Sequence, residues 1–581
     1  MKTVLKYFRP YIPRMALQLF IKFLGTITEL FIPLILSYIL DNIIPLEDES
    51  LIFFWGGIML LCAISVMVFN IIANPMAARI SRDAIIRIRH DLFKSISYLD
   101  CAEADRLTTS SLVSRLSSDS YNIHQMSSMM QRMGVRAPIL VIGGITLTLF
   151  LEPVMTSVMV ITLPLLGLLV YNISKRGIPM YTKVQQSVDK MVSRVQETMT
   201  GVRVIKALSK GKYEQDRFDE ASREVVKCDR KASLIMGLTS PCMHLIMNLG
   251  LCAVIITGAY RVNIGVTKPG TLIAFMSYFT MILTAMMAVT RMFIMYSKGA
   301  ASARRIAEVL NCKNSIETVY GDNQNQSDTN DSQIEFKNVS FSYNKVSNNV
   351  ENISFNLKKG ESLGIFGPTG CGKSTIVSLL LRFYDADSGE IFIDGKDIKS
   401  YPQKQLRQKF GVAFQNDFLF ADTIGENISF GRDLTNQQIQ NATKLACAEY
   451  IREKEGQYNH QLTVKGANLS GGQKQRLLIA RAVACKPDIL ILDDSQSALD
   501  YKTDAQLRKN IAMQTKSMTS IIISSRISSI MNCTKIMVME NGRILGLGTH
   551  KELYEALPQY KEISDIQLGS LFDGSKEGRA I

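Results

Sequence analysis

The chain of 581 residues is unusually apolar for a soluble protein of its length. Its residues are 47% hydrophobic and only 20% charged, and its mean hydropathy is +0.10. This composition excludes a disordered or fibrous protein and points to a membrane protein that carries a soluble part. Because the apolar residues are concentrated in the first half of the chain, we expect two large units.

The chain is also basic, with a formal net charge of +14 from 66 Lys and Arg residues against 52 Asp and Glu residues. Such an excess is typical of nucleic-acid binding, of contact with anionic lipid, or of cytoplasmic loops in a membrane protein. Most of the excess falls in two long connections between apolar stretches, so we expect no nucleic-acid partner. The ten cysteines contain no C-x-x-C pair, which favours a reduced cytosolic face.

Six apolar stretches are long enough to cross a bilayer. Four of them carry no charge over at least the roughly 20 residues that a spanning helix needs, and two are interrupted by charged residues. We predict a six-helix transmembrane domain over residues 1–310, with spans at about 15–40, 51–78, 132–152, 153–174, 236–261 and 269–297.

The distribution of Lys and Arg orients these spans, because positively charged flanks stay on the cytoplasmic side. The loop 41–50 has acidic residues and no Lys or Arg, so we place it outside. The long connections 79–136 and 175–231 are basic and are predicted to be helical arms on the cytoplasmic side. The sequence therefore predicts a multi-pass protein of the cell membrane with its N-terminus and its soluble domain in the cytoplasm.

Two features of the predicted spans are candidates for the transport path. Glu29 lies near the middle of the first span, and a charge inside the membrane is functional by default, so it is a candidate to line a substrate cavity. A structural polar contact is the alternative. The last span is rich in methionine and also carries Phe275, Tyr278 and Phe279, which predicts either a drug-binding wall or ordinary packing.

A polar segment separates the membrane domain from the soluble domain. Residues 311–332 are rich in Asn, Asp, Gln and Ser and read as a linker. The soluble domain is predicted to span 333–581.

A Gly-rich loop in this soluble domain predicts a nucleotide site. A strand, a turn and a helix follow one another and match G-x-x-x-x-G-K-S, in which backbone N–H groups approach phosphate. Lys373 would reach the β- and γ-phosphates, and Ser374 would bind Mg²⁺. The predicted cradle comprises Gly367, Pro368, Thr369, Gly370, Cys371, Gly372, Lys373, Ser374 and Thr375. We expect alkylation of Cys371 to block ATP binding.

Two further motifs follow along the chain. An apolar strand ends in Asp493, from which a carboxylate would orient Mg²⁺. Before it, a turn that enters a helix forms a second backbone anion site, made of Leu469, Ser470, Gly471, Gly472 and Gln473.

In this order and spacing the three motifs resemble the ATP-binding-cassette (ABC) family, and six spans followed by one cassette resemble an exporter half-transporter. The resemblance implies an α-helical six-span membrane domain with long cytoplasmic arms, followed by an α/β P-loop cassette domain. It also implies ATP and Mg²⁺ as cofactors and an ATPase coupled to transport. By the same resemblance Tyr343 stacks on adenine, Gln415 senses Mg²⁺, and Asp500 belongs to the D-loop.

In this family two cassettes dock head to tail, so the signature 469–473 of one chain closes over the phosphate loop of the other. The resemblance also implies short coupling helices at the ends of the two arms, near 108–117 and 200–210.

Two departures from the family pattern concern catalysis. Asp494 stands where the family usually has the general-base Glu, and Ser525 stands where it has the switch histidine. Because general-base catalysis typically contributes ~10²–10⁴-fold, we expect this chain's own site to bind ATP and to hydrolyse it poorly. The intact signature can still complete a site on a partner that has the Glu and the His, which favours a heterodimer.

The sequence thus resembles the degenerate-site subunit of heterodimeric bacterial multidrug exporters. We predict ATP-driven export of amphipathic small molecules across the cell membrane, with a second ABC half-transporter and the lipid bilayer as partners. Export of a lipid or a peptide, a non-hydrolysing ATP-binding regulatory subunit, and a homodimeric transporter are the alternatives.

Overall fold

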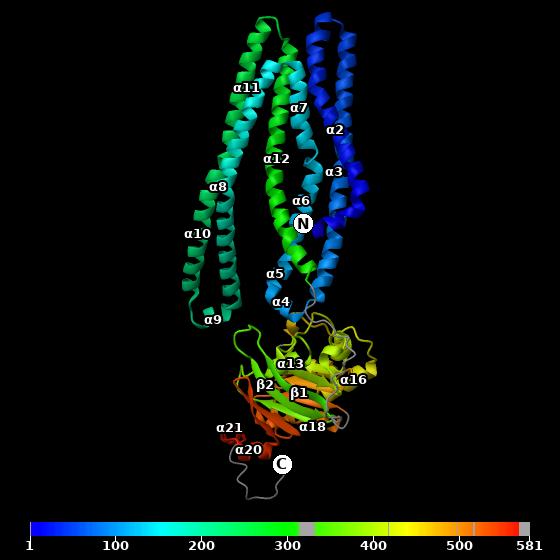
Figure 1. Ribbon diagram of the computed structural model, residues 1–581, viewed down its shortest axis with the longest axis vertical. Coiled ribbons are helices and arrows are strands. Elements are labelled where there is room, and N and C mark those ends of the chain that lie inside the picture. Colours follow the sequence, from blue (N-terminus) through cyan, green and yellow to red (C-terminus); the bar gives the residue numbers. More distant parts are fainter. Residues whose placement is uncertain (1, 313–331, 416, 497, 515–517, 569–581) are drawn as a thin grey trace. The chain divides into compact units, whose positions relative to one another are not determined.

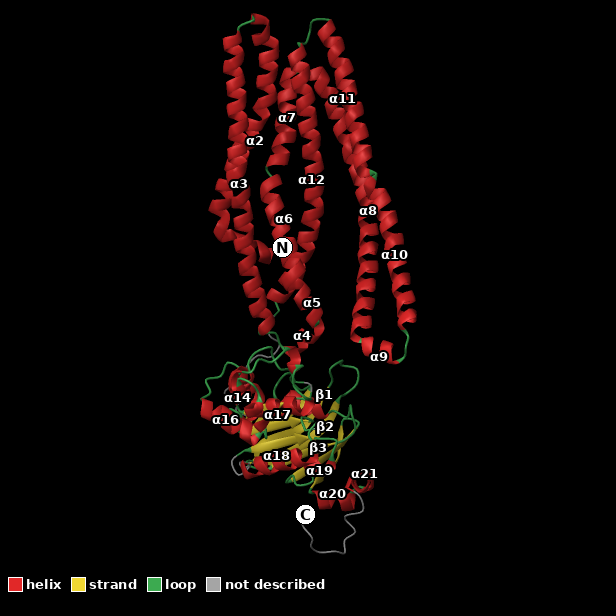
Figure 2. Cartoon of the chain, turned by 180° about the vertical axis from the view of Figure 1, so that it is seen from behind, coloured by secondary structure: helices red, strands yellow, loops and turns green. Residues whose placement is uncertain are grey.

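The computed structural model describes residues 2–312, 332–415, 417–496, 498–514 and 518–568. Their internal contacts divide the chain into a helical unit, 2–98 and 107–312, and an α/β unit, 99–106 with the described residues from 332 onward (Figures 1 and 2). This arrangement confirms the predicted fold class. Most of the predicted linker, 313–331, lies outside the described residues.

Six helical runs in the first unit are long and apolar enough to cross a membrane. Proline at the first position of two of these helices, Pro153 and Pro269, fits a helix start, where the missing N–H costs nothing. The long helices are α2 (Ile12–Tyr38), α3 (Glu49–Ser97), α6 (Ser120–Met133), α7 (Arg136–Leu151), α8 (Pro153–Thr200), α10 (Gly211–Gly237), α11 (Thr239–Asn263) and α12 (Pro269–Leu310). The short helices of this unit are α1 (Lys2–Leu5), α5 (Thr109–Ser114) and α9 (Val202–Ala207), whereas α4 (Cys101–Leu107) lies almost entirely in the segment that groups with the α/β unit.

Helices α8 and α10 form one arm of the first unit. Figure 1 shows them side by side, joined at their far ends by α9. Exposed apolar side chains lie along this end of the arm, at Val202, Val204 and Leu208.

Aromatic residues of α12 form the core of the helical unit. Phe275 and Phe279 are buried against Met155 and Met159 of α8. Tyr278 is fully buried, and its hydroxyl donates a hydrogen bond to the Leu30 carbonyl at 2.6 Å. These three aromatic residues therefore pack between helices in this conformation, as the packing alternative predicts, and do not form a cavity wall.

The α/β unit contains two sheets. An antiparallel sheet has the order β2-β1-β4-β5 and comprises β1 (Ser332–Phe341), β2 (Val350–Lys358), β4 (Ser388–Ile393) and β5 (Lys396–Asp397). A mainly parallel sheet has the order β10-β9-β3-β8-β7-β6 and comprises β3 (Ser362–Phe366), β6 (Phe410–Ala413), β7 (Ile489–Asp493), β8 (Thr519–Ile523), β9 (Lys535–Glu540) and β10 (Arg543–Gly548).

The central strands of the parallel sheet are continuous apolar runs because both of their faces are buried. Parallel pairing places the carboxyl ends of β3, β7 and β8 at one edge of the sheet. The phosphate loop follows β3, Asp493 ends β7, and Ser525 follows β8, so the topology alone brings three predicted elements together.

Nine α-helices lie between residue 373 and residue 568 in the described part of this unit. They are α13 (Lys373–Leu380), α14 (Gln403–Gln408), α15 (Ile424–Ser429), α16 (Asn436–Leu445), α17 (Gly471–Val483), α18 (Tyr501–Gln514), α19 (Ile527–Ile530), α20 (His550–Ala556) and α21 (Pro558–Leu568). Helices α15, α16 and α17 share a second apolar core with β7.

The short helix α4 differs from the expectation for the first coupling helix. Residues 99–106 group with the cassette, where Asp105 accepts a hydrogen bond from the Tyr384 hydroxyl at 2.5 Å. The segment 108–117, expected to be this helix, groups with the helical unit instead. Thr108 has φ +58°, and this break in the backbone separates the two segments.

Candidate functional site

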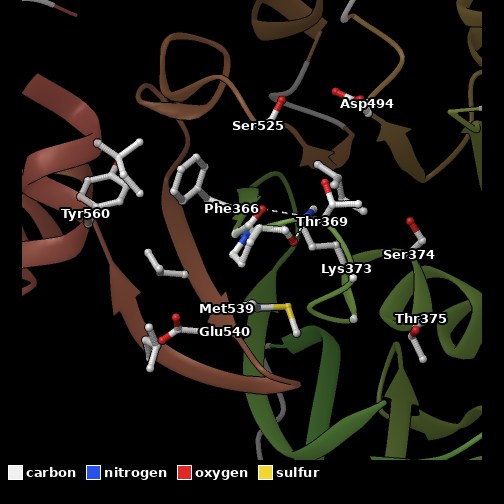
Figure 3. A pocket seen from close by; sticks show the side chains of 18 of the residues that line it. Phe366, Thr369, Lys373, Ser374, Thr375, Asp494, Ser525, Met539, Glu540 and Tyr560 are labelled. Atoms are coloured by element: carbon white, nitrogen blue, oxygen red, sulfur yellow. Dashed lines mark hydrogen bonds between the residues drawn. The ribbon is translucent and has the colours of Figure 1, made fainter. Parts of the chain in front are cut away.

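A cavity of about 770 Å³ lies at the carboxyl edge of the parallel sheet (Figure 3). Its walls come from the phosphate loop, from the ends of β7 and β9, from the loop after β8 and from α21. The predicted site residues on these walls are Gly367, Pro368, Thr369, Gly370, Gly372, Lys373, Ser374, Thr375, Gln415, Asp493, Asp494 and Ser525.

The phosphate loop depends on glycine at Gly372. This residue has φ +100°, and a Cβ there would lie 2.7 Å from the Asn349 carbonyl oxygen. Lys373 opens α13, and its ammonium group donates hydrogen bonds of 2.8 Å to the Gly367 and Pro368 carbonyls (Figure 3). The loop therefore presents backbone N–H groups and one cation to the cavity, which is the chemistry that binds phosphate.

Cys371 takes a different position from its neighbours in the loop. Its side chain is only 3% exposed and belongs to the apolar core of the cassette. Only the backbone of Cys371 is thus available to a phosphate group.

Three oxygen-bearing side chains from separate elements line the cavity and fit Mg²⁺. They are the Ser374 hydroxyl, the Gln415 amide and the Asp493 carboxylate, and Mg²⁺ prefers oxygen ligands. Burial raises the pKa of Asp493, and the neighbouring Asp494 raises it further, whereas a hydrogen bond from Ser374 lowers it. A bound cation would compensate for the burial of this charge.

Asp494 lies next to the metal-ligand candidates. Its backbone N–H donates to the Ile523 carbonyl at 2.9 Å, and its carboxylate accepts a 3.0 Å hydrogen bond from the Gln415 amide. Asp493 and Ile523 are paired across β7 and β8, so Asp494 and Ser525 leave the sheet at the same edge. The structure thus brings Gln415, Asp494 and Ser525 to one cavity.

The signature residues lie away from this cavity. Ser470 caps α17 in a reciprocal capping box, because its hydroxyl accepts from the Gln473 N–H while the Gln473 side chain accepts from the Ser470 N–H. Leu469 is buried, whereas Ser470 and Gly471 are exposed and Gly472 is half-buried. The signature turn therefore lies outside the residues that line this chain's phosphate cavity.

Asp500 and Tyr343 also lie outside the residues that line the cavity. Asp500 accepts from the Thr503 N–H at 2.9 Å at the start of α18, and this backbone hydrogen bond lowers the pKa of Asp500. Tyr343 is half-exposed and packs edge-on against Phe341 and Tyr384, so its role toward adenine stays a prediction.

Glu29 is paired in the helical unit. Its carboxylate forms a 2.6 Å ion pair with Arg136, and both side chains are partly exposed. Arg136 is thus the partner of Glu29 in the polar contact that was the alternative to a cavity role. Sequence reasoning missed Arg136 because 107 residues separate it from Glu29.

Sequence reasoning also missed the C-terminal helix α21. Gln559, Tyr560, Glu562 and Ile563 of this helix line the cavity. They carry no motif, and no local signal in the sequence connects them with a phosphate loop almost 200 residues earlier.

Comparison with known proteins identifies the architecture. Residues 15–286 match the ABC transporter transmembrane region, and residues 350–497 match the ABC transporter family of cassettes. The uncharacterized ABC transporter ATP-binding protein YfiB of Bacillus subtilis is 32% identical over 575 residues, which cover 98% of this chain and 99% of that protein. The chain belongs to the ABC transporter family.

Other relatives also match the transporter end to end. The uncharacterized ABC transporter ATP-binding protein YknU of Bacillus subtilis is 33% identical over 97% of both chains. The solved structure of a bacterial Atm1-family ABC exporter with ATP bound superposes with a TM-score of 0.83 at 23% identity, covering 98% of this chain and 99% of that chain. The transporter therefore has the fold of an exporter half-transporter, with a membrane domain fused to one cassette.

Membership in the family confirms several predictions. The transporter is a multi-pass membrane protein with a cytoplasmic cassette, which binds ATP and couples its hydrolysis to transport of a substrate across the bilayer.

Proposed function

We propose that this chain is one half of a heterodimeric exporter and that its own nucleotide site binds ATP with Mg²⁺ but hydrolyses it slowly. One observation carries the proposal: Asp494 and Ser525 line the phosphate cavity where the family places a glutamate and a histidine. Aspartate is one methylene shorter than glutamate, so its carboxylate reaches less far. Serine provides neither the positive charge nor the proton relay of an imidazole.

The residues of the site divide into binding and catalytic groups. The backbone of the phosphate loop and Lys373 bind the phosphates, and Ser374, Gln415 and Asp493 would hold Mg²⁺, which neutralises charge on the γ-phosphate. Asp494 would orient the attacking water from too far away. Because a positioned general base contributes ~10²–10⁴-fold, turnover at this site falls by up to that factor while binding persists.

Two surfaces of the chain support a partner. The intact signature turn, 469–473, lies away from this chain's own cavity, which fits a role over the phosphate loop of a second cassette. In the helical unit, Val202 and Val204 of α9 and Leu208 directly after it are exposed at 41%, 61% and 64%. Apolar side chains at the tip of an arm gain stability when another protein covers them. The partner would supply the catalytic Glu and the switch His.

An amphipathic small molecule is the substrate class that we propose. Polar and charged side chains lie among apolar ones on the helices that match the transmembrane region: Lys22 donates to Asn70 and Asn74, and Glu29 pairs with Arg136. Such groups interact with the polar part of a cargo whose remainder is apolar. The fusion of membrane domain and cassette favours export, and multidrug-type cargo is our first choice, with lipid or peptide as alternative cargo.

A non-hydrolysing regulatory subunit is less well supported. The signature turn is fully formed, with both hydrogen bonds of its capping box, and such a turn has value chiefly over ATP bound to another cassette.

The test compares this chain alone with the chain co-purified with a second half-transporter that has the Glu and the His, both in lipid. We expect ATP binding with little turnover for the chain alone, and turnover when the partner is present. A matched control replaces the catalytic Glu of the partner by Gln, which should abolish most of the turnover. Turnover that survives this change would contradict the asymmetric assignment.

A further inference from the structure

The loop after β8 carries Ser525 into the nucleotide cavity and is held from two directions. On one side, α18 contacts helix α19, which directly follows the loop: Arg508 donates to the Ser528 carbonyl, and the Ser529 hydroxyl donates to Asp504. These contacts hold residues 528–529 and do not involve the backbone next to Ser525.

On the other side, a single side chain from α21 contacts the backbone around Ser525. The Gln567 amide oxygen accepts from the Ile527 N–H at 2.8 Å, and its amide nitrogen donates to the Ser525 carbonyl at 3.0 Å. A carboxamide supplies a donor and an acceptor in one fork, whereas an ionised carboxylate supplies acceptors only. The fork spans Arg526 and sets the position of the residues on both of its sides.

Helix α21 is itself anchored to the strand that leads into the phosphate loop. Tyr560 is 1% exposed, and its ring packs edge-on against Phe366 at 5.8 Å between ring centroids. Phe366 is the last residue of β3 and directly precedes Gly367. The Tyr560 hydroxyl also contacts Nδ1 of His550 at 2.8 Å. One rigid helix thus joins the start of the phosphate loop to the loop that carries Ser525.

We propose that Gln567 is a positioning residue for the nucleotide site, through which α21 sets the distance between the phosphate loop and the loop after β8. Gln567 contacts backbone and lies outside the cavity lining, so it acts on the nucleotide through Ser525. The inference rests on the proposed nucleotide site of this chain but not on its slow turnover. Since Asp494 and Ser525 leave the sheet at the same edge, we expect the effect at the terminal phosphate, which ADP lacks.

The experiment measures the affinity of the full-length chain in lipid for Mg²⁺–AMP-PNP and for Mg²⁺–ADP, so that hydrolysis does not enter. Q567L keeps the size of the side chain and removes both hydrogen bonds. Q567E keeps the acceptor but turns a second oxygen toward the Ser525 carbonyl. The matched control is I566A, because Ile566 is the preceding residue on the same helix and is 76% exposed.

We expect Q567L and Q567E to weaken AMP-PNP binding about threefold to tenfold, the range that one or two hydrogen bonds produce. ADP binding should stay within about twofold, and I566A should change neither affinity. Since Gln567 is exposed, the Tm should shift by less than about 2 °C.

Unchanged AMP-PNP affinity in Q567L would overturn the proposal, as would equal losses for both nucleotides together with a lowered Tm, which indicate a merely structural contact. A wild-type chain that binds neither nucleotide would overturn the proposed nucleotide site itself, and the two failures are therefore distinguishable.

Discussion

Gln415 donates a side-chain hydrogen bond to the carboxylate of Asp494 across 3.0 Å. The residue predicted to sense Mg²⁺ is therefore in direct contact with the residue that stands in for the general base. The contact occupies one oxygen of a carboxylate that is already short for its task. A displacement of Gln415 would therefore also move the carboxylate of Asp494, which directly follows Asp493 in the cavity lining.

Restoring the family residues should restore catalysis at this site. In D494E combined with S525H, we expect ATP turnover by the chain to rise at least about tenfold. The glutamate carboxylate extends one methylene further than that of Asp494, and an imidazole replaces the serine hydroxyl. Steady-state phosphate release measures this. K373A in the same background should abolish the gain, since Lys373 holds the phosphates. An unchanged rate at unchanged ATP affinity would show that these two residues do not limit turnover.

The signature turn should act on the partner's nucleotide only. G471D places a carboxylate where backbone N–H groups would meet phosphate, and its Cβ would have only an ordinary contact, 3.5 Å from Ala498. We expect turnover with the partner to fall by about 10²-fold, comparable to the loss of an oxyanion donor, while ATP binding to this chain's own site is kept. The control G471A introduces the same Cβ without charge. Equal losses in both variants would contradict an electrostatic role.

Acidification should destabilise the cassette through His550. Burial lowers the pKa of His550 below its ordinary value of 6.5, so the unfolded chain takes up the proton more readily than the folded one. The contribution of neutral His550 to the free energy of unfolding is therefore fully present above about pH 6.5, and it decreases as the pH drops below that value. We expect the Tm of the wild type to fall more between pH 7.5 and 5.5 than that of H550Q. Identical falls would rule His550 out as the cause.

Alkylation should spare Cys371 in the folded protein, contrary to the simplest expectation for a thiol in a phosphate loop. Cys371 is 3% exposed within the core, whereas Cys485 is exposed, and burial raises the pKa of Cys533 to about 11, which keeps that thiol protonated and unreactive. Peptide mapping after brief maleimide treatment should find the label on Cys485. Stoichiometric label on Cys371 in the native state would contradict the observed packing.

Variants of the Glu29–Arg136 ion pair distinguish a structural role of Glu29 from a role in a substrate cavity. If the pair is structural, E29Q and R136Q should each lower the Tm, since each leaves one partly buried charge without its partner. The charge swap E29R with R136E should recover most of the loss. A cavity role predicts the opposite: single variants with normal Tm whose ATPase responds differently to amphipathic substrates.

Local patterns made the nucleotide motifs predictable from sequence. The phosphate loop 367–375 and the capping box of Ser470 and Gln473 depend on neighbours within a few residues, so their spacing contains the information. The order of β3, β7 and β8 in the sheet then brings the loop, Asp493 and Ser525 together.

Long-range contacts could not be predicted in the same way. Gln567 reaches Ser525 across 42 residues, and Arg136 reaches Glu29 across 107; no periodicity specifies such partners. The segment expected to be the first coupling helix, 108–117, groups with the helical unit, and 99–106 groups with the cassette. The break between them at Thr108, with φ +58°, has no Gly or Pro to signal it.

We expect this chain's own site to bind ATP without effective turnover. The most direct test is ATP binding and steady-state turnover by the chain purified alone in lipid. We expect saturable binding with turnover near the level of K373A, and turnover that appears when the partner is added. Robust turnover by the chain alone would show that Asp494 serves as an adequate base and that a homodimer is the working transporter.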